Sequence, residues 1–193
     1  FNEIYFSKSD QLKQTSDENL VKLLPYPLSA KINQIIKSKI NLDQDINEPQ
    51  FGYQICSVLG LYLRFLGVLL INVYANRIDK KNIKVNNLIV KTIRAPSDGS
   101  WLSLIRELLK FLNKENNDKN LLLLKNNLEQ KITNSNNKKY TIYMILEDLV
   151  SFRNKLVHGE KVDLNFIIQK FQDIINVFKN LTFLLSWKIF VRV

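Results

Sequence analysis

One long apolar stretch, residues 50–77, places the strongest constraint on how this 193-residue chain can fold. Its apolar side chains recur every three or four residues for about seven turns, which is the spacing of a helix. The whole chain contains only five glycines and four prolines, so few residues interrupt helices elsewhere. We therefore predict an all-α fold, a helical bundle of five to seven helices with residues 50–77 as its central helix.

The same stretch is also long and apolar enough to suggest a membrane span, because residues 55–74 are nearly all apolar. Arg64 falls at the centre of that segment, where a charge is costly in lipid. We therefore predict a core helix and no membrane contact. Gly60 and Gly67, a heptad apart on one face, would let a neighbouring helix approach closely.

Apolar spacing and capping residues predict the other elements of the chain. Further helices are expected at residues 9–24, 28–40, 100–112, 119–132, 140–157 and 164–186. Residues 78–98 are polar, and we predict mostly irregular structure there, ending at Ser97 or Asp98, either of which can cap the next helix. Residues 134–139 form the clearest loop, and only the last seven residues show strand-like alternation.

We divide the chain into an N-terminal helical region, residues 1–98, and a second helical bundle, residues 99–193, with one continuous domain as the alternative. The chain begins with Phe1 and ends in an apolar run, so we expect it to be a segment of a longer protein.

Charge and cysteine content narrow the class of function. Lysine and arginine total 28 against 18 acidic residues, and the net charge of +10 favours an anionic partner, with RNA the first candidate. The lysines are spread along the chain, so the charge alone does not establish RNA binding. One cysteine and one histidine are too few for an intrachain disulfide or an ordinary transition-metal site. We expect a cytoplasmic protein that needs no metal or cofactor.

The single histidine lies in the most informative motif of the chain, where Arg153 and Asn154 precede His158 and Gly159. An imidazole changes its charge near neutral pH, and a guanidinium is a permanently charged, planar group that suits phosphate. A site that cleaves phosphodiesters without metal needs a proton carrier and a group that stabilises phosphoryl charge. Arg153, Asn154 and His158 are therefore the candidate catalytic residues.

The predicted helix 140–157 places Arg153 in its inward apolar stripe, one turn after Leu149. A buried guanidinium needs a partner, so Arg153 should either pair with an acid or point into a cleft at the helix end. The acids that we expect as partners are Glu147, Asp148 and Glu107.

Gly159 predicts that this helix ends at His158, because glycine readily adopts the left-handed conformation that terminates helices. Asp163 would then cap the next helix. A helix that continued past His158 would hold the imidazole about 140° away from Arg153 around the axis. A helix that stops there lets the chain turn the imidazole back towards Arg153.

This arrangement resembles the HEPN superfamily, whose signature is an arginine, four to six residues and a histidine, often with a polar residue after the arginine. Arg153, Asn154 and His158 fit that signature with four intervening residues, and Gly159 matches a common extension. The resemblance covers the motif and its helical context, roughly residues 99–186. It is closest to the ribonuclease or toxin type of HEPN domain found in bacterial defence proteins.

The resemblance implies a metal-independent endoribonuclease that works as a homodimer, with the motif-bearing helices facing across the interface. His158 would transfer a proton as the ribose 2′-hydroxyl attacks the adjacent phosphate, and Arg153 would stabilise the phosphoryl charge. Asn154 would orient the histidine or the phosphate, and the product would end in a 2′,3′-cyclic phosphate. Such an effector, toxic or antiviral, would be controlled by another domain or a partner protein.

Two alternatives remain open at this point: a non-catalytic HEPN-like dimerisation or interaction module, and an unrelated helical domain. In either, Arg153 would form an ion pair at the edge of the core, Asn154 would be solvated, and His158 would interact with the helix dipole. Trp101 is expected to be a core residue and Cys56 a small buried hydrophobic residue.

Overall fold

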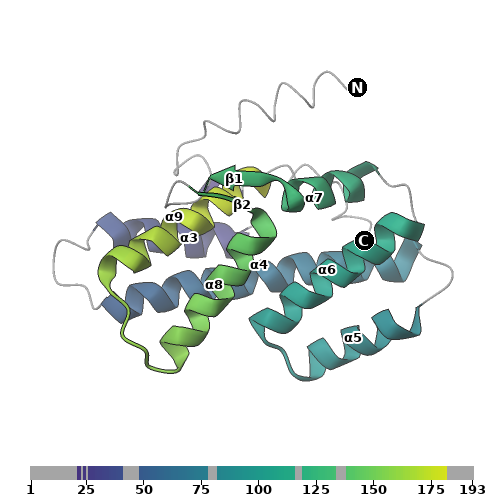
Figure 1. Cartoon of the computed structure of the whole chain (residues 1–193), viewed down its shortest axis with the longest axis horizontal. Helices are drawn as coiled ribbons and strands as arrows, with labels where there is room; N and C mark the ends of the chain where they lie inside the picture. The colour runs from purple at the N-terminus through teal and green to yellow at the C-terminus, as the bar shows by residue number, and fades with distance from the viewer. Residues whose placement is uncertain are drawn as a thin grey trace, which may run out of the picture.

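The computed structural model describes residues 21–22, 24, 26–40, 48–77, 82–115, 119–133 and 138–181. These residues form seven helices and one short hairpin, which confirms the predicted all-α class (Figure 1). The helices are α3 (Tyr26–Ile40), α4 (Glu48–Arg77), α5 (Ile83–Arg94), α6 (Asp98–Glu115), α7 (Lys119–Glu129), α8 (Ile142–Val157) and α9 (Leu164–Leu181). Most of the predicted helix 9–24, and the last seven residues, lie outside the described residues.

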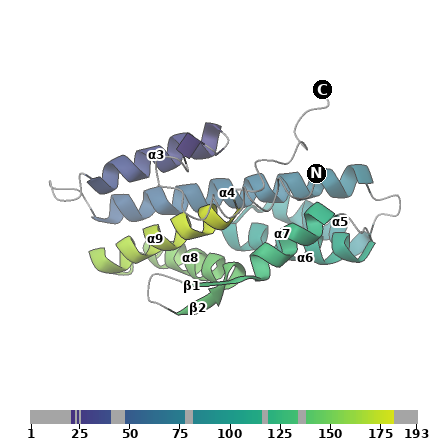
Figure 2. The ribbon, with the colours of Figure 1, turned by 90° about the horizontal axis from the view of Figure 1, so that it is seen from above.

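Helix α4 is the central element, as its sequence predicts. It is 30 residues long and packs against α3, α6, α8 and α9. Figure 2 shows α4 running the length of the molecule, with α3 on one side and α8 and α9 on the other. The segment Pro49–Asn76 is long and apolar enough to cross a membrane, and 61% of its most apolar window is buried inside the bundle. Packing between helices therefore accounts for its apolar length.

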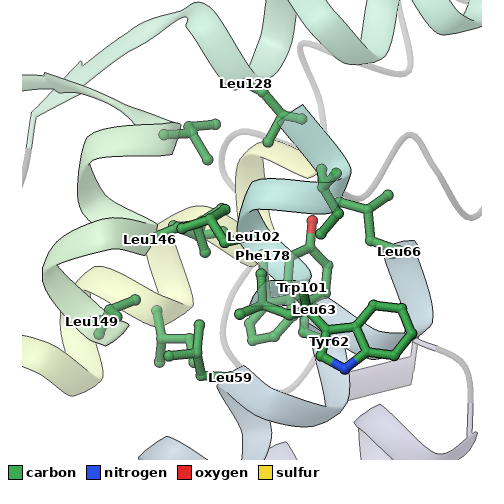
Figure 3. Packing of buried hydrophobic residues seen from close by; sticks show 14 of the residues in the cluster. Leu59, Tyr62, Leu63, Leu66, Trp101, Leu102, Leu128, Leu146, Leu149 and Phe178 are labelled. Carbon is green, nitrogen blue, oxygen red and sulfur yellow. The ribbon is translucent and has the colours of Figure 1, made fainter. Parts of the chain in front are cut away.

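The core is one hydrophobic cluster to which α4, α6, α8 and α9 all contribute (Figure 3). Tyr62 of α4 meets Phe178 of α9 edge to face, with ring centroids 4.9 Å apart. Leu102 of α6 and Leu146 of α8 belong to the same cluster. Residues from both sides of position 98 pack together in this cluster, so the two sequence regions share a core.

The two glycines on α4 face α6, as their heptad spacing predicts. A Cβ atom on Gly67 would clash with the ring of buried Trp101, and one on Gly60 would lie 2.9 Å from Oδ1 of Asp98. Both glycines therefore allow the close approach of α6. Trp101 is a core residue, as expected.

The prediction of irregular structure over residues 78–98 is wrong, because α5 occupies most of that segment. Asn82 caps the helix by accepting hydrogen bonds from the N–H groups of Lys84 and Val85, at 2.9 and 3.3 Å. Val85 and Thr92, a heptad apart, are its buried residues. Leu88 and Ile89 between them are partly buried against the core, so the helix face has the spacing i, i+3, i+4 and i+7, which was the available signal.

A two-stranded hairpin was not predicted either, because the helix expected over 119–132 ends earlier. Strands β1 (Lys131–Thr133) and β2 (Lys139–Thr141) are antiparallel, with Ile132 opposite Tyr140. Isoleucine and threonine favour extended backbone, which is consistent with the change of structure here. The hairpin leads directly into α8, where Thr141 accepts a hydrogen bond from the N–H of Met144 at 3.2 Å.

Candidate functional site

Helix α8 ends at the predicted place, and His158 is its C-cap residue. Gly159 has a φ of 73°, the left-handed conformation that glycine adopts without strain. The N–H of Glu160 donates to the carbonyl of Lys155 at 3.0 Å, and the N–H of Gly159 donates to the carbonyl of Leu156 at 3.1 Å. This pair of hydrogen bonds is a Schellman motif, and it confirms the glycine-terminated helix.

The end of α8 is held against the beginning of α4. The hydroxyl of Tyr53 donates to the carbonyl of Leu156 at 3.1 Å, and a Cβ atom on Gly52 would lie 2.8 Å from Cδ1 of Leu156. Asp163 caps α9 as predicted, since its carboxylate accepts a hydrogen bond from the N–H of Phe166 at 2.9 Å. The position of the candidate motif is therefore fixed on both sides.

His158 and Asn154 are exposed on the surface at this helix end. Neither side chain forms a hydrogen bond or ion pair with another residue in the part of the chain that the structure describes. The N–H of His158 donates to the carbonyl of Asn154 at 3.0 Å, as in a continuing helix. Both side chains are therefore accessible to a ligand.

Arg153 turns inward and is half-buried, with 35% of its side chain exposed. Its Nε lies 3.0 Å from Oδ2 of Asp98, the first residue of α6. Asp98 is only 3% exposed, so this ion pair joins α8 to α6 at the edge of the core. Of the two alternatives expected for Arg153, an acidic partner or a cleft at the helix end, the structure shows an acidic partner.

The three acids that the sequence suggested are not that partner. Glu147 pairs with Arg106 of α6 at 2.8 Å, and Asp148 pairs with Lys170 of α9. Glu107 forms no ion pair within the described residues. The choice among acids depends on how α6 packs against α8, which the spacing along α8 does not reveal.

Sequence reasoning missed Asp98 because it treated that residue as a possible helix cap. Ser97 is the cap: its hydroxyl accepts a hydrogen bond from the N–H of Ser100 at 3.0 Å, and its own N–H donates to the Ser100 hydroxyl at 2.9 Å. This reciprocal pair is a capping box. The three-residue spacing of Ser97 and Ser100 was the signal in the sequence. It identifies Ser97 as the cap, so the Asp98 side chain is not needed there and can turn inward.

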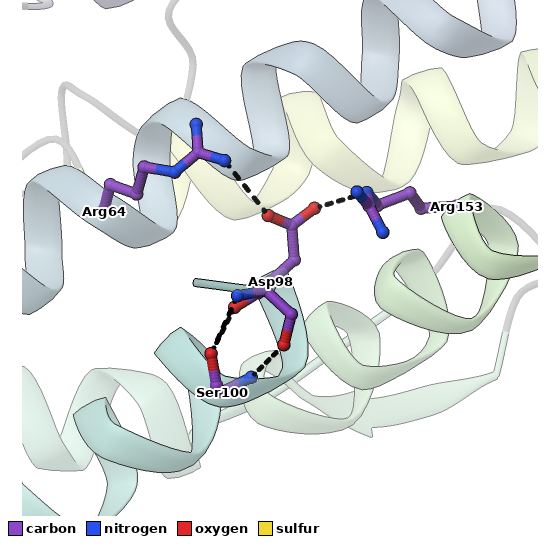
Figure 4. A network of polar contacts seen from close by, with 5 residues as sticks. Arg64, Asp98, Ser100 and Arg153 are labelled. Atoms are coloured by element: carbon purple, nitrogen blue, oxygen red, sulfur yellow. Dashed lines mark hydrogen bonds and ion pairs between the residues drawn. The ribbon is translucent and has the colours of Figure 1, made fainter. Parts of the chain in front are cut away.

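A second guanidinium approaches the same carboxylate from α4. Nη2 of Arg64 lies 4.0 Å from Oδ1 of Asp98, and the Arg64 side chain is 52% exposed. Figure 4 shows Arg64 and Arg153 reaching Asp98 from opposite sides. Neither guanidinium forms a hydrogen bond with a described residue. We call Arg64, Asp98 and Arg153 the arginine cluster, and it carries a net charge of +1.

Cys56 lies on the buried face of α4, near Arg153 and Asp98 of the arginine cluster. Burial raises the pKa of the Cys56 thiol from 9.0 to about 12, while the nearby charge of Arg153 lowers it and that of Asp98 raises it by smaller amounts. Cys56 lies one turn before Gly60 on α4. Such a thiol is almost wholly protonated at neutral pH and does not act as a nucleophile.

A second polar cluster, which sequence reasoning also missed, joins α8 and α9. Lys170 is buried, contacts Asp148, and lies 3.5 Å from the carboxylate of buried Asp173. A pocket of about 340 Å³ beside it is lined by Glu147, Asp148 and Phe166, among others. Within the described ranges, no group of three or more histidine, cysteine or acidic residues is arranged to hold a metal ion.

The three motif residues share the end of α8, but no contact joins Arg153 to His158 within one chain. His158 has a φ of −84°, and its N–H still belongs to the helix. Its Cβ therefore leaves the helix near the helical direction, about 140° around the axis from that of Arg153. Ending the helix at Gly159 does not by itself bring the two groups together.

Comparison of the chain with protein-family models, with curated proteins and with solved structures found no match. The resemblance to HEPN domains therefore rests on the motif and on its position at the end of a helix in an all-α bundle.

Proposed function

We propose that this chain is a metal-independent endoribonuclease of HEPN type, acting as the effector part of a larger bacterial defence or toxin protein in the cytoplasm. One observation carries the proposal. An exposed imidazole without a partner among the described residues, His158, lies on the same helix end as an arginine held in place by a buried carboxylate.

Arg153 supplies the group that stabilises phosphoryl charge. Asp98 holds the guanidinium before any substrate arrives, and a preorganised cation stabilises developing charge without a cost of reorganisation. Its N–H groups form no hydrogen bond with a described residue, so they can donate to phosphate oxygens in the bidentate geometry that guanidinium favours.

His158 transfers the proton. The uncharged amide of Asn154, one turn earlier on the same helix, can donate and accept hydrogen bonds. As the ribose 2′-hydroxyl attacks phosphorus, the imidazole takes the hydroxyl proton or gives a proton to the leaving 5′-oxygen. The bond from phosphorus to the 5′-oxygen breaks, and a 2′,3′-cyclic phosphate remains. DNA lacks the attacking hydroxyl and is not a substrate.

The proposed reaction requires a homodimer. Because Arg153 and His158 leave one helix in different directions, the arginine of one protomer would act with the histidine of its partner. The exposed side of α8 that carries Asn154 and His158 would form this interface.

The other candidate is a non-catalytic dimerisation module, and the ion pair itself favours it. Arg153 already has a partner in Asp98, as an arginine with a purely structural role would. In that case the exposed residues of α8 would serve only to bind a second copy or a regulatory protein.

Cleavage of single-stranded RNA in EDTA distinguishes the two functions. The wild type should produce fragments ending in 2′,3′-cyclic phosphate, and His158→Ala should be slower by about 100-fold or more. Lys161→Ala is the control, because Lys161 is also exposed beyond the end of α8 but lies outside the motif. Equal rates for the wild type and His158→Ala, or no cleavage by a wild-type dimer, would overturn the ribonuclease proposal and leave the dimerisation module.

A further inference from the structure

Arg64 occupies a position that the core role of α4 does not explain. It lies in the middle of the most apolar helix, yet 52% of its side chain is exposed and its guanidinium is directed towards Asp98. Asp98 already has a closer partner in Arg153, at 3.0 Å against 4.0 Å. One carboxylate neutralises only one of these two cations, so the arginine cluster keeps a positive charge at the surface.

A structural role for Arg64 is weakly supported by its geometry. An ion pair at 4.0 Å with one partner half-exposed contributes little to stability, because water screens the charges. The pair also lacks a hydrogen bond. A structural arginine at this place would be expected to dock against the carboxylate as closely as Arg153 does.

The positions of the two guanidiniums do favour the binding of one anion by both arginines. The two guanidiniums approach the two oxygens of one carboxylate from opposite sides, and both keep N–H donors that form no hydrogen bond with a described residue (Figure 4). Asp98 is fixed by its burial, by the capped start of α6 and by the space that Gly60 leaves. Positioning two donors in advance lowers the entropy cost of binding a ligand between them.

We propose that Arg64 is a second phosphate-binding residue, and that Arg64 and Arg153 together hold one phosphate of the RNA backbone with Asp98 as their positioning residue. RNA fits the chain's net charge of +10. The choice of RNA as ligand rests on the proposed function, but this binding requires no cleavage and is tested apart from it.

The test measures binding of a fluorescent single-stranded 2′-O-methyl RNA, which lacks the attacking hydroxyl, by anisotropy at several salt concentrations. Arg64→Ala should weaken binding about tenfold and reduce the slope of log Kd against log salt by about one. Arg64→Lys should recover part of the affinity, because lysine restores the charge but not the planar fork. Arg94→Ala is the matched control, since Arg94 is an exposed arginine at the end of α5 that forms no ion pair with Asp98.

Thermal unfolding shows that the variants are folded, and Arg64→Ala should unfold at the wild-type temperature because Arg153 still pairs with Asp98. Equal affinity and salt slope for Arg64→Ala and Arg94→Ala would overturn the phosphate site, even if His158→Ala abolishes cleavage. A tenfold loss with Arg64→Ala would support the phosphate site, even if the wild type leaves natural RNA uncut.

Discussion

Two polar clusters in this bundle join helices through buried charges, and they expose charges of opposite sign to solvent. In the arginine cluster the buried group is the carboxylate of Asp98, and the half-exposed groups are guanidiniums. In the cluster between α8 and α9 the buried groups are the ammonium of Lys170 and the carboxylate of Asp173, and the exposed partner is Asp148, with 54% of its side chain accessible. The arginine cluster therefore exposes positive charge to solvent, and the cluster between α8 and α9 exposes negative charge.

This difference distinguishes a surface that suits an anionic ligand, such as the proposed RNA, from one that does not, and the net charge of the chain cannot make that distinction. The arginine cluster presents N–H donors and a positive charge. The pocket beside Lys170 is lined by Glu147 and Asp148, which repel phosphate. A basic chain thus has one surface suited to an anionic ligand and another that excludes it, and the predictions that follow test this contrast.

The largest effect is expected for Lys170→Met, which removes the buried cation and keeps most of its volume. Asp173 would remain buried without that ammonium, and breaking a buried pair on one side costs about 3–5 kcal/mol of unfolding free energy. Urea unfolding measures the loss, with exposed Lys161→Met as control. RNA binding by the folded variant should stay unchanged, and weakened binding would contradict the contrast between the two clusters.

A smaller loss of stability is expected for Arg153→Met, about 2 kcal/mol, because the more distant Arg64 remains near Asp98. Sequence reasoning left open whether Arg153 pairs with an acid or points into a cleft, and the ion pair with Asp98 is the reason to expect a cost in stability. Arg153→Lys keeps a positive charge beside Asp98, so it should recover most of the stability.

The same two variants separate the structural role of Arg153 from its proposed chemical role. Arg153→Lys should still cleave RNA poorly, because an ammonium lacks the bidentate fork. Full cleavage by Arg153→Lys would show that the bidentate fork is not required, and wild-type stability of Arg153→Met would show that Asp98 does not hold the guanidinium.

The sequence predicted the long helices because each has a regular apolar stripe and a recognisable end. Residues 50–77 and 140–157 correspond closely to α4 and α8, and Gly159 marked the end of α8 correctly. Helix α5 was missed because its core-facing side is short and includes the polar Thr92 with Val85, Leu88 and Ile89. The spacing of apolar residues is therefore sufficient to predict a helix with many buried residues and insufficient for one with few.

Only those features of the candidate site that depend on a single helix could be predicted from the sequence. The motif, the helix end and the need for an acid near Arg153 follow from spacing along one helix. The identity of Asp98 and the approach of Arg64 depend on how α4, α6 and α8 pack together, which no local pattern encodes. The buried Lys170 was missed for the same reason, since its partners lie on two helices.

Gly60→Ala tests whether the space that Gly60 leaves beside Asp98 affects stability and RNA binding. The new Cβ would lie 2.9 Å from Oδ1 of Asp98, a crowding cost that exceeds alanine's helix preference and leaves a net loss of about 1 kcal/mol. Gly99→Ala is the control, because its Cβ would meet only Val150, at an ordinary 3.8 Å. RNA affinity should fall with Gly60→Ala alone; equal affinity in both variants would show that the carboxylate position does not govern the arginines.

The smallest effect is expected at Cys56, which should not react with iodoacetamide in the folded protein at pH 7–9. Burial raises its pKa from 9.0 to about 12, so the folded chain keeps the proton where an unfolded chain loses it. The raised pKa of Cys56 leaves the free energy of unfolding unchanged below about pH 9 and lowers it as the pH rises from 9 towards 12.

Alkylation rates from pH 7 to 10, with and without urea, test the state of the Cys56 thiol, and the urea-unfolded chain is the positive control. An inflection near pH 9 in the alkylation rate of the folded protein would mean that water reaches Cys56 on the buried face of α4. Asp98 would then be better solvated than its burial indicates, and it would hold Arg153 less firmly. An unreactive thiol would show that water does not reach the buried face of α4 beside Asp98. This supports a fixed Asp98 carboxylate whose two arginine partners keep positive charge facing solvent.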